Sequence, residues 1–180
     1  SFYNYTPFLN QAFDEIYEGW FGSTYAAPWR WEFVTQSWSR DLGNLPRGEK
    51  GTVTLKARNI GSNTWSNSGS NPIRLATIRP NGRGSGFYTA GWIDGSKVAN
   101  LQESSVAPNQ VGTFVFDVQA NPSVGSYNEY FSLVAENAAW FNDNSYYLGI
   151  NVVNPTISGQ VTQNTYPTSM TAGATGTATV

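Results

Sequence analysis

The sequence predicts an all-β fold, an antiparallel β-sandwich preceded by a short N-terminal α-helical extension. Three observations support this prediction. Apolar and polar residues alternate with the period of two that a half-buried strand requires. Clusters of Asn, Pro and Gly separate the alternating segments. Charged residues make up only 12% of the 180 residues and aromatic residues 15%, a balance that favours short strands and polar turns over long salt-bridged helices.

The start of the chain predicts the helix. Thr6-Pro7 supplies an N-cap and a first helical position, and the residues up to Trp20 are amphipathic. The apolar positions at helical spacing are Phe8, Leu9, Phe13, Ile16, Tyr17 and Trp20. We expect this helix to bury its apolar face in an assembly contact, and name Phe8, Phe13 and Trp20 as candidate assembly residues.

The predicted sandwich begins near Trp29. Its clearest strand lies around residues 52–58, where buried-type and polar residues alternate. The alternating apolar residues of the successive strands are Val53, Leu55 and Ala57; Ile73 and Leu75; Phe114, Phe116 and Val118; and Tyr146, Leu148, Ile150 and Val152. Strands that recur at this spacing, with turn signals between them, are typical of a sandwich.

The end of the chain repeats an earlier pattern. Residues 34–37 and 48–53 reappear as residues 161–164 and 173–178, so the tail reads as the first strands of a second copy, or as a segment that pairs between molecules. Val161 and Val180 are its candidate assembly residues. The predicted organisation is a helical extension and linker (1–28), a sandwich (29–154) and a tail (155–180).

Composition argues against several classes of function. The net charge of −2 and the scattered Lys and Arg residues give no reason to expect nucleic-acid binding. No apolar run is long enough to span a bilayer, so we expect no membrane insertion. The chain has no histidine, the usual general base and commonest metal ligand, and no cysteine. We therefore expect a non-enzymatic protein with no cofactor and no bound metal.

A series of short motifs extends over residues 31–153. In chain order they are Lys56–Gly61 followed by Asn63-Thr64-Trp65, Leu75, Trp92, Val106–Asn109, Phe114, Pro122 with Gly125-Ser126-Tyr127, Leu133–Glu136 and Trp140-Phe141. In this series the region resembles the immunoglobulin-like four-tryptophan family, which occurs in an autophagy receptor and in tandem in bacterial secreted and surface proteins. The resemblance implies an immunoglobulin-like antiparallel β-sandwich and an extracellular or cell-surface location.

The same resemblance implies structural roles for particular residues. They are Gly61, Trp65, Trp92, Gly125, Tyr127 and Trp140. Tyr127 follows a turn as in a tyrosine corner, in which the hydroxyl bonds back to nearby backbone. The chain departs from the family at Tyr130, where many members have tryptophan, and at Asn109, where glycine is usual. The resemblance therefore predicts a fold and carries no ligand with it.

Other residues suggest binding sites. Trp29 and Trp31 fall on one face of an extended segment, where docking on the N-terminal helix is the favoured interpretation. The alternative is that, with Trp38, they form an aromatic platform for sugar rings. The helix carboxylates Asp14, Glu15 and Glu18 are interpreted as a solvated face. A second polar cluster offers oxygen atoms to calcium but lacks the spacing of a calcium loop, so we interpret it as a polar loop. Its members are Glu136, Asn142, Asp143 and Asn144.

These observations lead to one main hypothesis of function and one alternative. The main hypothesis is a non-catalytic structural or assembly module of a cell-surface or filament-forming protein, joined to itself or to neighbouring modules through its C-terminal tail. The alternative is a carbohydrate-binding accessory module that recognises a polysaccharide through exposed aromatic residues. An enzyme would need a pair of carboxylates in a cleft, and the sequence offers no such pair in the sandwich.

Overall fold

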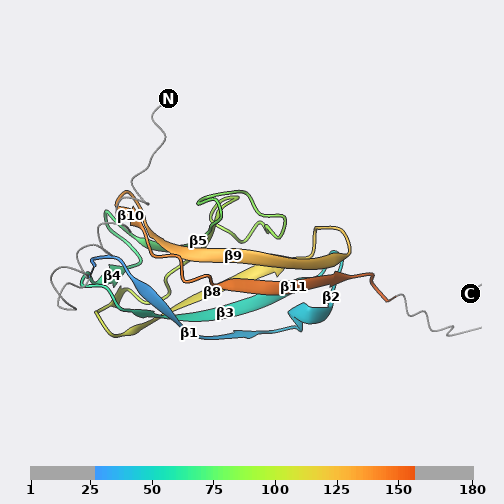
Figure 1. Ribbon diagram of the computed structural model, residues 1–180, viewed down its shortest axis with the longest axis horizontal. Coiled ribbons are helices and arrows are strands. Elements are labelled where there is room, and N and C mark those ends of the chain that lie inside the picture. The colour runs from blue at the N-terminus through green and yellow to red at the C-terminus, as the bar shows by residue number, and fades with distance from the viewer. Residues whose placement is uncertain (1–26, 157–180) are drawn as a thin grey trace, which may run out of the picture.

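The computed structural model describes residues 27–156, and this part of the chain is all-β (Figure 1). Its strands are β1 (Trp31–Trp38), β2 (Leu45–Pro46), β3 (Lys50–Asn59), β4 (Trp65–Ser66), β5 (Ile73–Thr77), β6 (Lys97–Asn100), β7 (Ser105–Val106), β8 (Val111–Gln119), β9 (Gly125–Ala135), β10 (Ala139–Trp140) and β11 (Tyr147–Val153). A single turn of 3-10 helix, η1 (Leu42–Asn44), precedes β2, and no α-helix occurs between residues 27 and 156.

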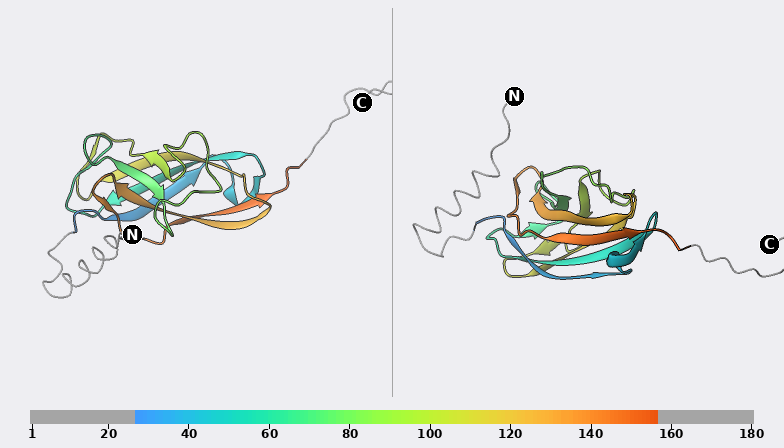
Figure 2. Two further views of the ribbon diagram at one scale, coloured as in Figure 1. Left: turned by 90° about the horizontal axis from the view of Figure 1, so that it is seen from above. Right: turned by 45° about the vertical axis from the view of Figure 1, so that its right-hand side comes forward.

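The strands form two main sheets that face each other in a sandwich-like arrangement (Figures 1 and 2). One sheet has the order β1-β3-β8. The other has the order β2-β11-β9-β5-β6, with β10 paired to β9. A small third sheet pairs β4 with β7. All pairings are antiparallel except that of β2 with β11.

The alternating segments of the sequence are strands in the structure. In β3, Val53, Leu55 and Ala57 are fully buried, while the residues between them are half-buried or exposed. The other predicted sets lie in β5, β8 and β11, with Tyr146 directly before β11. Burying one face of each strand removes apolar surface from water, which is the dominant stabilising term of such a fold.

Aromatic side chains fill the space between the sheets. The large, fully buried ones are Trp31, Trp65, Phe87, Phe114 and Phe131. Trp65 meets Phe141 edge-on at 5.6 Å between ring centroids. Trp92 is also buried, and its Nε1 donates to the carbonyl oxygen of Asp117 at 2.6 Å. Trp140, on β10, is half-buried. Edge-on contacts of this kind add stability beyond the area they bury.

Two turns explain the glycines at Gly61 and Gly125. A Cβ on Gly61 would lie only 2.5 Å from the carbonyl oxygen of Pro28, so no larger side chain fits there. Gly125 has a φ of 153°, a conformation that L side chains rarely adopt. It leads into Tyr127, whose hydroxyl donates to the carbonyl oxygen of Ser123 at 2.8 Å. This bond to backbone four residues upstream is the one that the sequence predicts for a tyrosine corner.

A β-bulge in β1 decides which of its side chains face inward. Phe33 is opposite Ala57, but the register then slips, and Gln36 and Trp38 are opposite Leu55 and Val53. Residues directly opposite in a sheet point to the same face. Because the β3 partners are buried, Phe33, Gln36 and Trp38 all point to the inner side of their sheet. If the same sequence paired without the bulge, with Val34 opposite Lys56, Gln36 and Trp38 would point outward.

Some expectations concern other parts of the chain. The helical extension with Phe8, Phe13 and Trp20 lies outside the described residues, as does the tail with Val161 and Val180. Within residues 27–156, no helix is long and apolar enough to cross a membrane.

Candidate functional site

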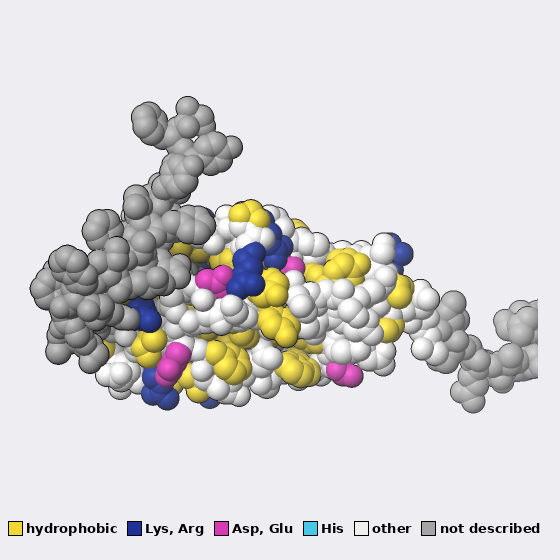
Figure 3. All heavy atoms as spheres, in the orientation of Figure 1, with side chains coloured by type: hydrophobic (Ala, Val, Ile, Leu, Met, Phe, Trp, Pro, Cys, Tyr) yellow, Lys and Arg dark blue, Asp and Glu magenta, His cyan; other side chains and the backbone are white. Residues whose placement is uncertain are grey.

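One side of the sandwich leaves two strand edges facing each other. Within the described part, β1 pairs only with β3, and β11 pairs with β9 and, over Val152 and Val153 alone, with β2. We call the side between β1 and β11 the seam. Hydrophobic side chains gather on this face of the molecule (Figure 3). Apolar side chains left uncovered at a sheet edge mark a candidate binding surface.

A shallow pocket of about 240 Å³ lies in the seam. Its lining residues, which we call the seam site, are Phe33, Gln36, Asn144, Ser145, Tyr146 and Tyr147. β1 supplies Phe33 and Gln36, the connection before β11 supplies Asn144, Ser145 and Tyr146, and Tyr147 is the first residue of β11. The two sets are more than a hundred residues apart in the sequence, so only the folded sandwich brings them together.

Phe33 and Tyr146 form the aromatic wall of the seam site. Their rings stack with centroids 5.5 Å apart and an interplanar angle of 21°. Phe33 is 45% exposed, whereas Tyr146 is nearly buried, and this burial raises the pKa of Tyr146 above its ordinary value. The Tyr146 hydroxyl donates to Oε1 of Gln36 at 2.8 Å. The Gln36 amide nitrogen donates no hydrogen bond to the described residues, so it can serve a ligand.

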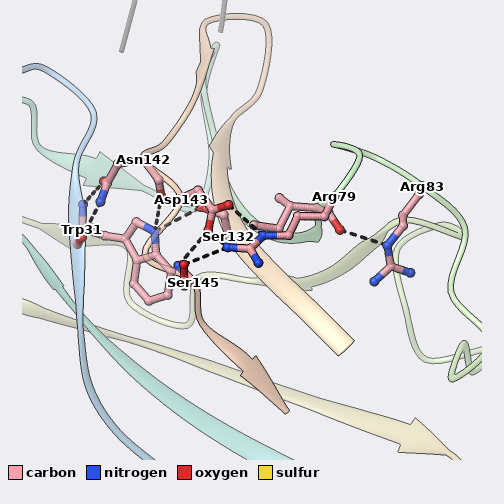
Figure 4. Close-up of polar contacts among 8 residues, drawn as sticks. Trp31, Arg79, Arg83, Ser132, Asn142, Asp143 and Ser145 are labelled. Carbon is pink, nitrogen blue, oxygen red and sulfur yellow. Dashed lines mark hydrogen bonds and ion pairs between the residues drawn. The ribbon is translucent and has the colours of Figure 1, made fainter. Parts of the chain in front are cut away.

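Trp31 anchors the connection that forms the other wall (Figure 4). The Asn142 side chain pairs with the Trp31 backbone as a neighbouring strand would: Oδ1 accepts from N at 3.0 Å, and Nδ2 donates to O at 3.2 Å. The Trp31 ring Nε1 donates to Oγ of Ser132 at 3.1 Å and to the Asn142 carbonyl at 3.2 Å. Asn144 Nδ2 also donates to the Trp31 carbonyl. These bonds satisfy the edge backbone at Trp31.

Arg79 holds the connection from the side of the second sheet (Figure 4). Its Nε and Nη2 donate to the two carboxylate oxygens of Asp143 at 2.9 and 3.2 Å, and Nη2 also donates to Oγ of Ser145 at 2.7 Å. Its guanidinium carbon lies 4.2 Å from the ring centroid of Tyr130, whose ring is 5.3 Å from that of Tyr147. A bidentate pair of this kind fixes orientation as well as distance.

The pKa of Asp143 shows which effect wins at this ion pair. Desolvation of the carboxylate acts to raise its pKa, but hydrogen bonds from the Arg79 side chain and the Ser145 backbone outweigh it, and the pKa is lowered. The same hydrogen bond raises the pKa of Arg79. Both groups therefore stay charged near neutral pH, and they compensate each other beside the seam site.

The predicted tryptophan platform does not form. Trp31 is 0% exposed, because residues 142–144 and the opposite sheet cover it. Trp29 is half-buried against Phe141, with ring centroids 5.7 Å apart. Only Trp38 is freely exposed, at 45%. β1 begins at Trp31, so Trp29 lies before the strand, and the sequence pattern does not reveal what packs over either ring.

The cluster considered for calcium is divided among separate contacts. Asp143 binds Arg79, and Asn142 and Asn144 bind the Trp31 backbone. The carboxylate of Glu136 lies 3.3 Å from Nζ of Lys97. The described residues contain no group of acidic side chains that converges on one point. Here the polar-loop interpretation fits, and the helix carboxylates Asp14, Glu15 and Glu18 lie outside the description.

Sequence reasoning did not bring together the residues that line the seam site, although it named Asn144 in the polar cluster. Phe33 and Gln36 were not selected, and Tyr146 was assigned to a core strand. The one usable signal was that Phe33 lies two residues after Trp31, on the same face of an extended segment. The bulge that turns Gln36 inward leaves no mark in the composition.

The lining of the seam site is uncharged. Its lining contains two tyrosines and no carboxylate, and the nearby Asp143 is already paired with Arg79. What remains is one exposed aromatic face, a second exposed ring at Tyr147, and uncharged amide and hydroxyl groups.

No family model matches the chain, and comparison with curated proteins gives no significant match.

Proposed function

We propose that residues 29–154 are a non-catalytic, immunoglobulin-like module of an extracellular surface protein, and that its seam site binds a neutral carbohydrate. The immunoglobulin-like assignment is supported by the two facing sheets and by the Tyr127 hydroxyl that bonds back to Ser123. The extracellular placement rests on the resemblance of residues 31–153 to modules of secreted and surface proteins.

One observation carries the carbohydrate proposal: exposed aromatic rings and uncharged hydrogen-bonding groups line one shallow pocket. The apolar face of a pyranose ring stacks on an aromatic ring, and its hydroxyls bond to amides and hydroxyls placed around it. Phe33 supplies the ring, and Gln36 and Ser145 supply polar groups. Since Asp143 and Arg79 neutralise each other, the site favours an uncharged ligand.

The size of the pocket suggests how much ligand it holds. At about 240 Å³ it lies below the usual range of roughly 300–1,000 Å³ for drug-sized ligands. It is also shallow and open to solvent, so a ligand longer than the pocket can lie across it. We therefore expect a polysaccharide chain of which one or two sugar units make contact.

The test is binding to a panel of neutral soluble polysaccharides by affinity electrophoresis and isothermal titration calorimetry. The unaltered chain is expected to bind at least one, and Phe33→Ala to weaken that binding about tenfold through lost stacking. Trp38→Ala is the matched control, because Trp38 lies on the same strand with the same 45% exposure but does not line the pocket. Absence of binding to every polysaccharide, or equal losses in both variants, would refute the proposal.

The open edge of β1 favours assembly as a second candidate function. Val34 and Trp38 are exposed, and the single charge of β1, on Glu32, lies 2.9 Å from Arg58. A strand edge without free charges can pair with another chain. Sedimentation velocity should then show self-association that Val34→Lys abolishes and Val34→Thr preserves; a monomer at all concentrations would exclude self-association. The role predicted for the tail stays a prediction.

A further inference from the structure

Arg79 connects two structural units that meet at the seam site. It follows β5 by two residues and has a φ of 65°, a left-handed conformation that is uncommon outside glycine. From there its guanidinium reaches the connection before β11 through Asp143 and Ser145, and β9 through the ring of Tyr130. One side chain thus touches a loop and a sheet face.

Both contacts of Arg79 lead to lining residues of the seam site. Ser145 is itself one of them; its backbone N–H donates to Asp143 Oδ1 at 2.7 Å, and its φ of 55° marks a tight turn. Tyr130 packs against Tyr147, a second lining residue that is 46% exposed. Arg79 therefore constrains the hydroxyl of Ser145 and the ring of Tyr147 at once.

We propose that Arg79 is a positioning residue of the seam site, so that binding of an uncharged ligand depends on the Arg79–Asp143 ion pair. This inference rests on the proposed carbohydrate function. Arg79 lies outside the pocket lining and acts through Ser145 and Tyr147. Lysine cannot replace it, because a single ammonium lacks the planar fork that engages both Asp143 oxygens and stacks on Tyr130.

The Arg79–Asp143 ion pair predicts the direction in which ligand affinity changes with pH. Among the described residues, the other titratable side chain in contact with the pair is Tyr130 of β9, whose ring lies 4.2 Å from the Arg79 guanidinium carbon. Because the folded-state pKa of Asp143 lies below its ordinary value of 3.8, the pair stabilises the site above that pH. Its contribution is lost as the pH falls below about 4 and through that lowered pKa.

The experiment measures affinity for the bound polysaccharide from about pH 3 to pH 7. Arg79→Ala and Asp143→Asn are each expected to lower affinity about tenfold at neutral pH. The double variant should be no worse than either, since residues that act as one unit are not additive. Asp143→Asn should also remove most of the acid-induced loss seen in the unaltered chain. Arg79→Lys should recover only part of the affinity.

Arg58→Ala is the matched control. Arg58 forms an ion pair with Glu32 at 2.9 Å, and its side chain is 40% exposed against 41% for Arg79, but it does not contact the seam site. It is expected to bind like the unaltered chain. If Arg79→Ala binds with unchanged affinity, or if Asp143→Asn keeps the full acid-induced loss, the inference is wrong.

A ligand-free measurement separates this inference from the proposed function. Hydrogen exchange of the amides from Asn144 to Tyr147 should be faster in Arg79→Ala than in the unaltered chain and in Arg58→Ala. If no polysaccharide binds but this exchange is faster, the proposed function fails and the positioning role of Arg79 stands. If a polysaccharide binds but exchange is unchanged, the positioning role fails and the function stands.

Discussion

The two long sides of the sandwich are built differently. On the side away from the seam, Leu101 and Phe114 form a backbone bridge between the sheets, and the N–H of Gln119 bonds to the carbonyl of Phe87. Leu101 and Phe87 are buried there. At the seam no strand joins β1 to β11 in the described part, and Phe33 and Trp38 are each 45% exposed. Closure of one side and exposure of the other confine the candidate binding surface to the seam.

The boundary between covered and open seam lies within β1. Trp31 and Phe33 are two residues apart and point to the same side of the sheet, yet Trp31 is completely covered by residues 142–144 and Phe33 is not. Beyond this point, Tyr146 is the one aromatic ring within residues 27–156 that stacks on the strand. Residues 142–144 cover Trp31 but extend no further along β1, so a pocket remains at Phe33 on the edge of the sandwich.

Trp31→Ala should disrupt the part of the seam that residues 142–144 cover, and we expect it to cause the largest loss of stability. It removes a fully buried ring and the two hydrogen bonds of its Nε1, so we expect a loss of about 3–5 kcal/mol in the free energy of unfolding. Urea denaturation followed by far-UV circular dichroism measures this loss. A loss under about 1 kcal/mol would mean that the connection does not depend on Trp31 for its anchorage.

Gly61→Ala should have an intermediate effect on the same region. The added Cβ would meet the Pro28 carbonyl at 2.5 Å and the Arg30 nitrogen at 2.9 Å, and these backbone atoms lead directly into β1. We expect a loss of about 1–3 kcal/mol, the range for overpacking. The same denaturation series measures it, with Gly95→Ala as the control, since nothing lies within 4 Å of a Cβ at Gly95. Equal stabilities of the two variants would contradict the expectation.

Trp38→Ala should have the smallest effect of the three variants, with almost no change in the free energy of unfolding. The side chain is 45% exposed, and the described residues form no aromatic pair with it. We expect a change within about 0.5 kcal/mol, as for most surface substitutions. A loss of more than about 1 kcal/mol would show that this end of the seam is covered in solution by another part of the chain or by a second copy.

The sequence predicted the interior of the fold better than its seam. Alternation alone placed Val53, Leu55 and Ala57 in the core, because burial of one strand face follows from local pattern. Tyr127 was assigned correctly because the bond that it makes is local, four residues away. The seam depends on contacts between β1 and a connection more than a hundred residues later, and no local pattern encodes such contacts. For that reason the sequence did not reveal that residues 142–144 cover Trp31.

The bulge between Phe33 and Thr35 decides which side chains in the second half of β1 face inward. Removing the single residue Val34 would make β1 regular and leave the later pairs unchanged, so Gln36 and Trp38 would still lie opposite Leu55 and Val53 and point inward. The sequence of the interior in β3 and β8 would be untouched. The inward face of β1 would therefore survive loss of the bulge residue, whereas pairing the same sequence without a bulge would place Thr35 and Ser37 on that face instead.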